Sequence, residues 1–209
     1  MIRNIKALGL ALVAVFAMSA VIASGASAGT VEVEGGGETA ISGAQEGTHV
    51  FSVEGNKVEC TTANFEAVGK TKNGATSIVV HPVYTGCSAF GFLEATVTTT
   101  GCNYTVTSGA VEAGKAAGTI VLGCGGGTIT IVASTCTATV AGQTINNGLV
   151  AENKAGPPQW VRLTATNSNV KTNKTKDGFL CPFNGTGEVT ATYTGNTSTT
   201  GTPSGFNLK

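Results

Sequence analysis

The segments SIVVHPVYTGC (77–87), ATVTTTGC (95–102) and NYTVT (103–107) decide the fold, and they lie within a longer stretch of similar character, 76–140. In the last two, apolar residues largely alternate with hydroxyl-bearing ones. Successive side chains of a strand point to opposite faces, so this alternation gathers the hydroxyls on one face and the Val and Ala side chains on the other. β-Branched residues also pack well on a pleated surface. The stretch is therefore predicted to form half-buried β-strands.

Similar short strands are predicted on both sides of this stretch. A strand at 30–34 is followed by a hairpin, in which 48–53 and 57–61 flank a short connection that contains glycine. Further strands are expected at 160–166 and 188–193. No segment after residue 28 has a convincing helical pattern. Many short strands joined by Gly-rich turns predict an all-β fold, a single antiparallel domain of the β-sandwich type or barrel-like.

The first 28 residues have the pattern of a signal peptide. Arg3 and Lys6 form a basic start, 7–23 is apolar, and 26–28 reads Ala-Ser-Ala, the small-residue pattern of a cleavage site. The apolar run is close to the minimum length for a membrane span, so the alternative is an uncleaved anchor. The cleavage site favours export, and no membrane span is expected after signal cleavage.

Three regions follow from this interpretation. They are a signal peptide (1–28), a secreted β domain (29–194) and a tail rich in Thr, Ser and Gly (195–209) that is predicted to be flexible. The expected localisation is extracellular or at the cell surface.

The charge balance argues against one class of partner. The chain has 12 basic and 12 acidic side chains, and removal of the signal segment leaves a slight acidic excess. A nucleic-acid-binding protein needs a basic surface, so no nucleic acid is expected as a partner.

Six cysteines lie after the signal segment, and an even number in an exported chain predicts three disulfides. The candidates are Cys60, Cys87, Cys102, Cys124, Cys136 and Cys181. Sequence cannot choose among the possible pairings. If hairpin ends meet, neighbours pair: Cys87 with Cys102, Cys124 with Cys136, and Cys60 with Cys181. The chain contains no Cys-x-x-Cys pair, so neither a metal site nor any cofactor is predicted.

Groups for acid–base catalysis are few. His49 and His81 both fall in predicted strands, where a strand-edge imidazole is the ordinary interpretation. No nucleophile elbow or zinc-protease motif is present. Scattered carboxylates offer no preferred pair for a glycosidase-type site; they are Glu59, Glu66, Glu94, Asp177 and Glu188. The chain is therefore expected not to be an enzyme.

Aromatic side chains are the best candidates for a binding face, because their rings offer a large and rigid contact area. These possible binding aromatics are Tyr84, Tyr104, Trp160 and Tyr193. A packing role in the core or at a sheet edge is the competing interpretation.

Three segments, 14–20 (AVFAMSA), 58–65 (VECTTANF) and 84–91 (YTGCSAFG), carry a resemblance that spans most of the chain. With them the chain resembles uncharacterised small secreted bacterial β-proteins that are rich in Thr and Gly and have six cysteines. The resemblance implies a bacterial extracytoplasmic protein and supplies no catalytic residues.

The sequence thus predicts a secreted, non-enzymatic structural or binding protein. The expected partners are cell-wall or extracellular polysaccharide, or protein. The alternative is an extracellular hydrolase or carbohydrate-binding protein that uses a cleft of carboxylates and aromatic rings.

Overall fold

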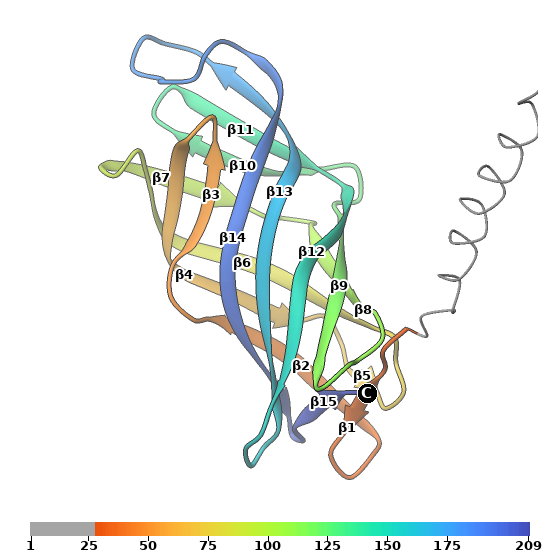
Figure 1. The fold of residues 1–209 in the computed structure, drawn as a ribbon. Helices are drawn as coiled ribbons and strands as arrows, with labels where there is room; N and C mark the ends of the chain where they lie inside the picture. Colours follow the sequence, from red (N-terminus) through yellow and green to blue (C-terminus); the bar gives the residue numbers. More distant parts are fainter. Residues whose placement is uncertain (1–27) are drawn as a thin grey trace, which may run out of the picture.

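A computed structural model describes residues 28–209, and the predicted signal segment therefore lies, apart from Ala28, outside the described residues. The described chain is built of antiparallel β-strands, which confirms the predicted all-β class. Of the two architectures that the sequence left open, the structure has the barrel (Figure 1). Among residues 28–209, no helix has the length and apolar character needed to cross a membrane.

Residues 28–209 form fifteen strands. They are β1 (Val31–Val33), β2 (Glu38–Gln45), β3 (His49–Val53), β4 (Asn56–Ala67), β5 (Thr71–Lys72), β6 (Ser77–Ala89), β7 (Leu93–Thr98), β8 (Asn103–Ser108), β9 (Lys115–Gly123), β10 (Thr128–Ala133), β11 (Cys136–Ala141), β12 (Gln143–Lys154), β13 (Trp160–Lys176), β14 (Gly187–Thr202) and β15 (Phe206–Leu208).

Four long strands, β4, β6, β13 and β14, run through both halves of the barrel. In the lower half of Figure 1 they close into a ring with β2, β8, β9 and β12. In the upper half they close into a second ring with β3, β7, β10 and β11. Each ring contains eight strands, so neither half of the barrel has a free edge within the ring.

The alternation in the sequence decides which side chains fill the interior. In β10 the side chains of Ile129, Ile131 and Ala133 are buried, whereas Thr128 and Thr130 are half-buried and Val132 is exposed. Burial of one such isoleucine contributes about 1.5–3 kcal/mol. In β10 the Thr-x-Thr pattern thus marks the outer face of the barrel wall.

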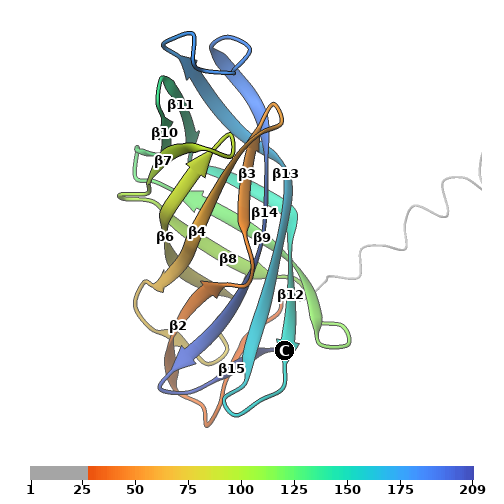
Figure 2. The ribbon, with the colours of Figure 1, turned by 90° about the vertical axis from the view of Figure 1, so that its left-hand side faces the viewer.

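Both ends of the barrel are covered by chain. At the lower end β1 pairs with β15 and buries Phe206 completely, and Figure 2 shows β15 at this end and the β10–β11 hairpin at the other. At the upper end the ring of Phe183, from the segment after β13, packs edge-on against Phe90. The buried Lys174 also binds Glu54 of the β3–β4 turn through an Nζ–Oε1 contact of 2.6 Å.

All six cysteines are in disulfides, as predicted, but the neighbour pairing suggested by the sequence is wrong. The bonds are Cys60–Cys87, Cys102–Cys124 and Cys136–Cys181. The β6–β7 hairpin places Ala95 opposite Cys87, so Cys102 lies well beyond the reach of Cys87. Instead β6 also pairs with β4, where Cys60 stands directly opposite Cys87.

The other two bonds follow from strand register in the same way. Cys102 and Cys124 flank the cross-strand pair Asn103–Gly123 of β8 and β9. Cys136, the first residue of β11, is separated from Cys124 by strand β10. It stands opposite Lys176 near the end of β13 and bonds to Cys181 in the segment after β13. Each bond closes a loop of 22 to 45 residues, and such a loop contributes about 3–4 kcal/mol by restricting the unfolded chain.

The prediction that 195–209 forms a flexible tail is wrong as well. β14 continues to Thr202, pairs with β13 on one side and with β2 on the other, and buries Thr197 and Thr199. After a turn, β15 closes the lower end of the barrel. The β domain therefore extends to the end of the described chain rather than to residue 194.

Candidate functional site

The barrel encloses a cavity of about 130 Å³. Strands of both rings line it, mainly with aliphatic side chains such as Ile78, Val106, Ile120, Leu149 and Leu163. An engineered apolar cavity of about 150 Å³ accommodates benzene, so a cavity of this size is large enough for a small organic molecule.

Three tyrosines and one histidine project into this apolar interior from four different strands. They are Tyr84 of β6, Tyr104 of β8, Tyr193 of β14 and His49 of β3. Sequence had suggested the three tyrosines as a binding face. The structure does bring them together, but inside the barrel and not on its surface.

The four side chains form one line of hydrogen bonds, here called the tyrosine–histidine chain. His49 Nε2 lies 2.8 Å from the carbonyl oxygen of Asn196, which can only accept, so this nitrogen carries the proton. His49 Nδ1 is therefore an acceptor, and the Tyr193 hydroxyl, 2.5 Å away, donates to it.

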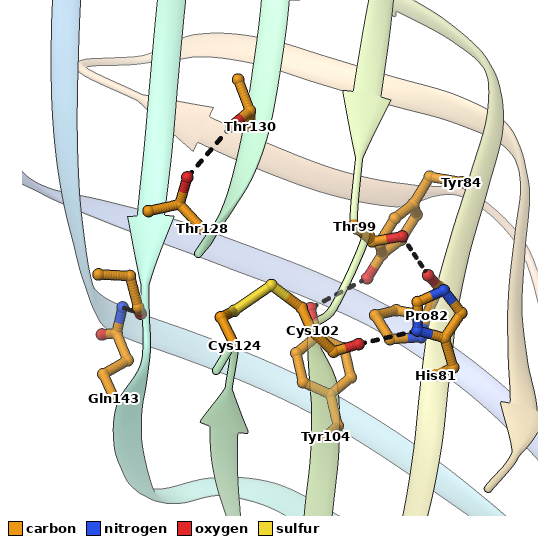
Figure 3. Close-up of a disulfide and its surroundings, with 11 residues drawn as sticks. His81, Pro82, Tyr84, Thr99, Cys102, Tyr104, Cys124, Thr128, Thr130 and Gln143 are labelled. Carbon is orange, nitrogen blue, oxygen red and sulfur yellow. Dashed lines mark hydrogen bonds between the residues drawn. A yellow bond between two sulfur atoms is a disulfide. The ribbon is translucent and has the colours of Figure 1, made fainter. Parts of the chain in front are cut away.

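The remaining two hydroxyls continue the line in the same direction. The Tyr84 hydroxyl lies 3.2 Å from the Tyr193 oxygen and donates to it, because the Tyr193 proton is already engaged by His49. The Tyr104 hydroxyl, 3.4 Å from the Tyr84 oxygen, donates to Tyr84. Figure 3 shows the hydroxyl groups of Tyr84 and Tyr104 pointing toward each other near the Cys102–Cys124 disulfide.

Local backbone geometry makes room for the histidine ring. A Cβ atom at Gly195, in the neighbouring strand β14, would lie only 2.5 Å from His49 Nδ1. Glycine in the middle of a strand often marks such a close approach. Phe65 packs beside the same imidazole with ring centroids 5.8 Å apart.

Burial keeps the four side chains of the tyrosine–histidine chain uncharged. Loss of solvent raises the pKa of Tyr84, Tyr104 and Tyr193 well above the ordinary value. Loss of solvent also lowers the pKa of His49, and its hydrogen bond to Asn196 offsets only part of that effect. At neutral pH these four side chains therefore carry no charge, which suits a cavity for a neutral ligand.

Three further polar residues line the cavity: Asn167 of β13, and Thr197 and Thr199 of β14. Asn167 is 4% exposed, and its Oδ1 atom has no hydrogen-bond partner. It stands at a bulge in the β13–β14 ladder, where the register shifts before Val170. A Cβ atom at Gly148, in a second bulge in β12, would lie 1.5 Å from this oxygen, so the glycine leaves the space that the amide occupies.

Sequence reasoning treated His49 as a weak candidate and missed Asn167. The signal for Asn167 is present in the alternation of β13: Leu163 and Ala165, four and two residues before it, also line the cavity. A polar residue that continues the inward phase of a strand is the pattern that marks it.

The other residues singled out from the sequence lie elsewhere. Trp160, the first residue of β13, is half-buried and is not part of the cavity wall. His81 binds the carbonyl oxygen of Cys102 through Nδ1 at 2.8 Å, a structural contact that Figure 3 shows.

None of the carboxylates considered for hydrolysis lines the cavity. Glu66, Glu94, Asp177 and Glu188 are exposed, and Glu59 is half-buried. Within the described part of the chain, no cluster of three or more His, Cys, Asp or Glu side chains is arranged to hold a metal ion.

Fold and site together define a disulfide-linked antiparallel β-barrel with a neutral, largely apolar interior cavity. No protein-family model, curated protein or solved structure matches this chain. The geometry of the cavity is therefore the basis for the functional argument.

Proposed function

We propose that this protein is an exported, non-enzymatic binding protein that holds a small apolar molecule inside its barrel. The cavity of about 130 Å³ is the observation that carries the proposal. Protein interiors are normally packed to a density that leaves few voids larger than a water molecule. An interior space lined by aliphatic side chains and crossed by a few ordered polar groups has the character of a small-molecule site.

The disulfides and the sequence of the amino terminus support the exported location. Three disulfides are compatible with an oxidising environment. The basic, apolar and small-residue pattern of 1–28 supports export to the cell surface or the extracellular space. In such a setting a closed barrel would protect an apolar molecule from water.

Toluene, which is close to benzene in size, is a suitable probe. We expect it to bind the purified protein with a Kd on the order of 1 mM, since the ligand has few atoms and gains mainly from leaving water. NMR titration measures this directly. The chemical-shift changes should fall on residues that line the cavity, and an absence of binding by toluene would overturn the proposal.

A variant that fills the cavity tests the proposal, and the same change at the surface is its matched control. Ala165→Leu adds bulk to a buried residue of the cavity wall and should weaken toluene binding at least tenfold. Ala44→Leu makes the same change at an exposed position of β2 and should leave binding unchanged. Equal binding by both variants would place the toluene site outside the barrel.

A further inference from the structure

The two ends of the barrel are covered in different ways. The lower cover is a ladder, in which β1 pairs with β15 and Phe206 is buried. The upper cover is the segment 177–186 between β13 and β14, which Figure 1 shows at the top of the barrel. Within the described chain no strand pairs with this segment, and such segments open more readily than paired strands. Its Phe179 and Leu180 are 91% and 60% exposed, so an apolar ligand meets apolar side chains at this end.

A small void lies between the upper cover and the cavity. Its volume is about 10 Å³, and it is lined by Phe183 of the segment and by Phe90 of the β6–β7 turn. Phe51, Val58 and Ile131 line both this void and the cavity, so the two spaces share a wall. The lower end has a comparable void of about 20 Å³, but there the β1–β15 ladder forms the cover.

A buried ion pair holds the upper segment against a neighbouring turn. Lys174 Nζ lies 2.6 Å from Glu54 Oε1 and 3.0 Å from the carbonyl oxygen of Asn184. Glu54 Oε2 accepts a hydrogen bond of 3.0 Å from the backbone N of Asn184. One carboxylate thus ties the segment to the β3–β4 turn. The Cys136–Cys181 disulfide keeps the segment attached to β11 when these contacts break.

We propose that the segment 177–186 is a gate through which the ligand enters and leaves the cavity, and that the contact between Lys174 and Glu54 keeps this gate closed. The inference rests on the proposed function, because it concerns access to the same cavity. When the ion pair breaks, Phe183 moves with the gate and opens the void above the cavity. The disulfide limits this movement, so the gate closes again over the bound ligand.

The exchange of toluene tests the gate, and NMR line shapes measure its dissociation rate. Glu54→Ala leaves Lys174 buried without its partner, which destabilises the closed gate, and should raise this rate about tenfold or more. Lys174→Met removes the same contact without leaving a buried charge, because the Glu54 side chain is 30% exposed. It should raise the rate about threefold and covers the case that the alanine variant does not fold. In both variants the toluene Kd should stay within about twofold, because a gate changes association and dissociation alike.

Glu34→Ala is the matched control at the lower end. Glu34 Oε1 accepts a hydrogen bond of 3.2 Å from the backbone N of Gln159, so there too a carboxylate holds a connecting segment. This variant should leave the dissociation rate unchanged. Unchanged rates in both gate variants with toluene still bound, or an equal or larger rise in Glu34→Ala, would overturn the inference and leave the proposed function standing. Absence of toluene binding to the unaltered protein would overturn the proposed function, and the gate with it.

Discussion

At the scale of single residues, the direction of the tyrosine–histidine chain follows from one backbone carbonyl. The Asn196 oxygen fixes which nitrogen of His49 carries the proton, and this choice orients each hydroxyl in turn. Each tyrosine donates toward His49, and His49 donates to the Asn196 oxygen, so these groups are paired in surroundings where an unsatisfied group is costly.

This order predicts unequal effects of removing single hydroxyls. Tyr193→Phe leaves two buried groups without partners, the His49 Nδ1 acceptor and the Tyr84 donor, and should lower the free energy of unfolding by about 2–4 kcal/mol. Tyr104→Phe removes only the first donor of the line and should cost about 1 kcal/mol. Urea denaturation of the two variants measures both values.

The two tyrosine variants control for each other, because both lose one phenolic oxygen from the same cavity. Equal losses of stability would show that the hydrogen bonds do not run in the order His49–Tyr193–Tyr84–Tyr104. A larger loss for Tyr104→Phe would contradict the donor directions.

At the scale of elements, alternation in the sequence was sufficient to predict strands such as β10 and β11, where every second side chain is buried. It failed for the end of β14, whose inward positions are Thr197, Thr199 and Gly201 and not large apolar residues. Pairing with β13 and β2 holds this segment, and such pairing depends on partners distant in the chain. Alternation also cannot locate a bulge, so the register shift beside Asn167 could not be expected from the residues alone.

The last strand therefore contributes stability in a way that can be measured. Phe206 of β15 is 0% exposed and packs among the residues that close the lower end of the barrel, including Val31, Ile41 and Val161. Phe206→Ala should lower the free energy of unfolding by about 3–5 kcal/mol, because it removes a buried ring and leaves a cavity.

Phe92→Ala is the matched control for this prediction. Phe92 lies in the turn between β6 and β7 and is 79% exposed, so its loss should change stability by no more than about 0.5 kcal/mol. Equally small effects at both positions would mean that the carboxyl-terminal segment is not part of the packed fold.

At the scale of the whole molecule, the barrel closes through pairings that no local pattern reveals. The β4–β6 ladder joins 58–67 to 80–89, whereas the β14–β2 ladder joins 197–202 to 40–45 across most of the chain. Short strands with Gly-rich turns are compatible with a sandwich or a barrel, and only these closing ladders distinguish the two. The candidate site was hidden for the same reason, because closure brings together residues of five strands, His49, Tyr84, Tyr104, Asn167 and Tyr193.

Determining which cysteines are bonded tests this barrel closure without any mutation. Cleavage after lysine and arginine places Cys60 in peptide 58–70, Cys87 and Cys102 together in 73–115, Cys124 and Cys136 together in 116–154, and Cys181 in 177–209. With the bonds of the barrel, every bond joins two different peptides. We therefore expect mass spectrometry of the non-reduced digest to give one species that contains all four peptides.

Neighbour pairing would give a different digest. Peptides 73–115 and 116–154 would each carry an internal bond and appear singly, and 58–70 would be linked only to 177–209. Reduction of the sample before digestion is the control, because it should release all four peptides in either case. Since Cys60 bonds to Cys87 only when β4 lies beside β6, the neighbour pattern would contradict the ladder on which both rings of the barrel depend.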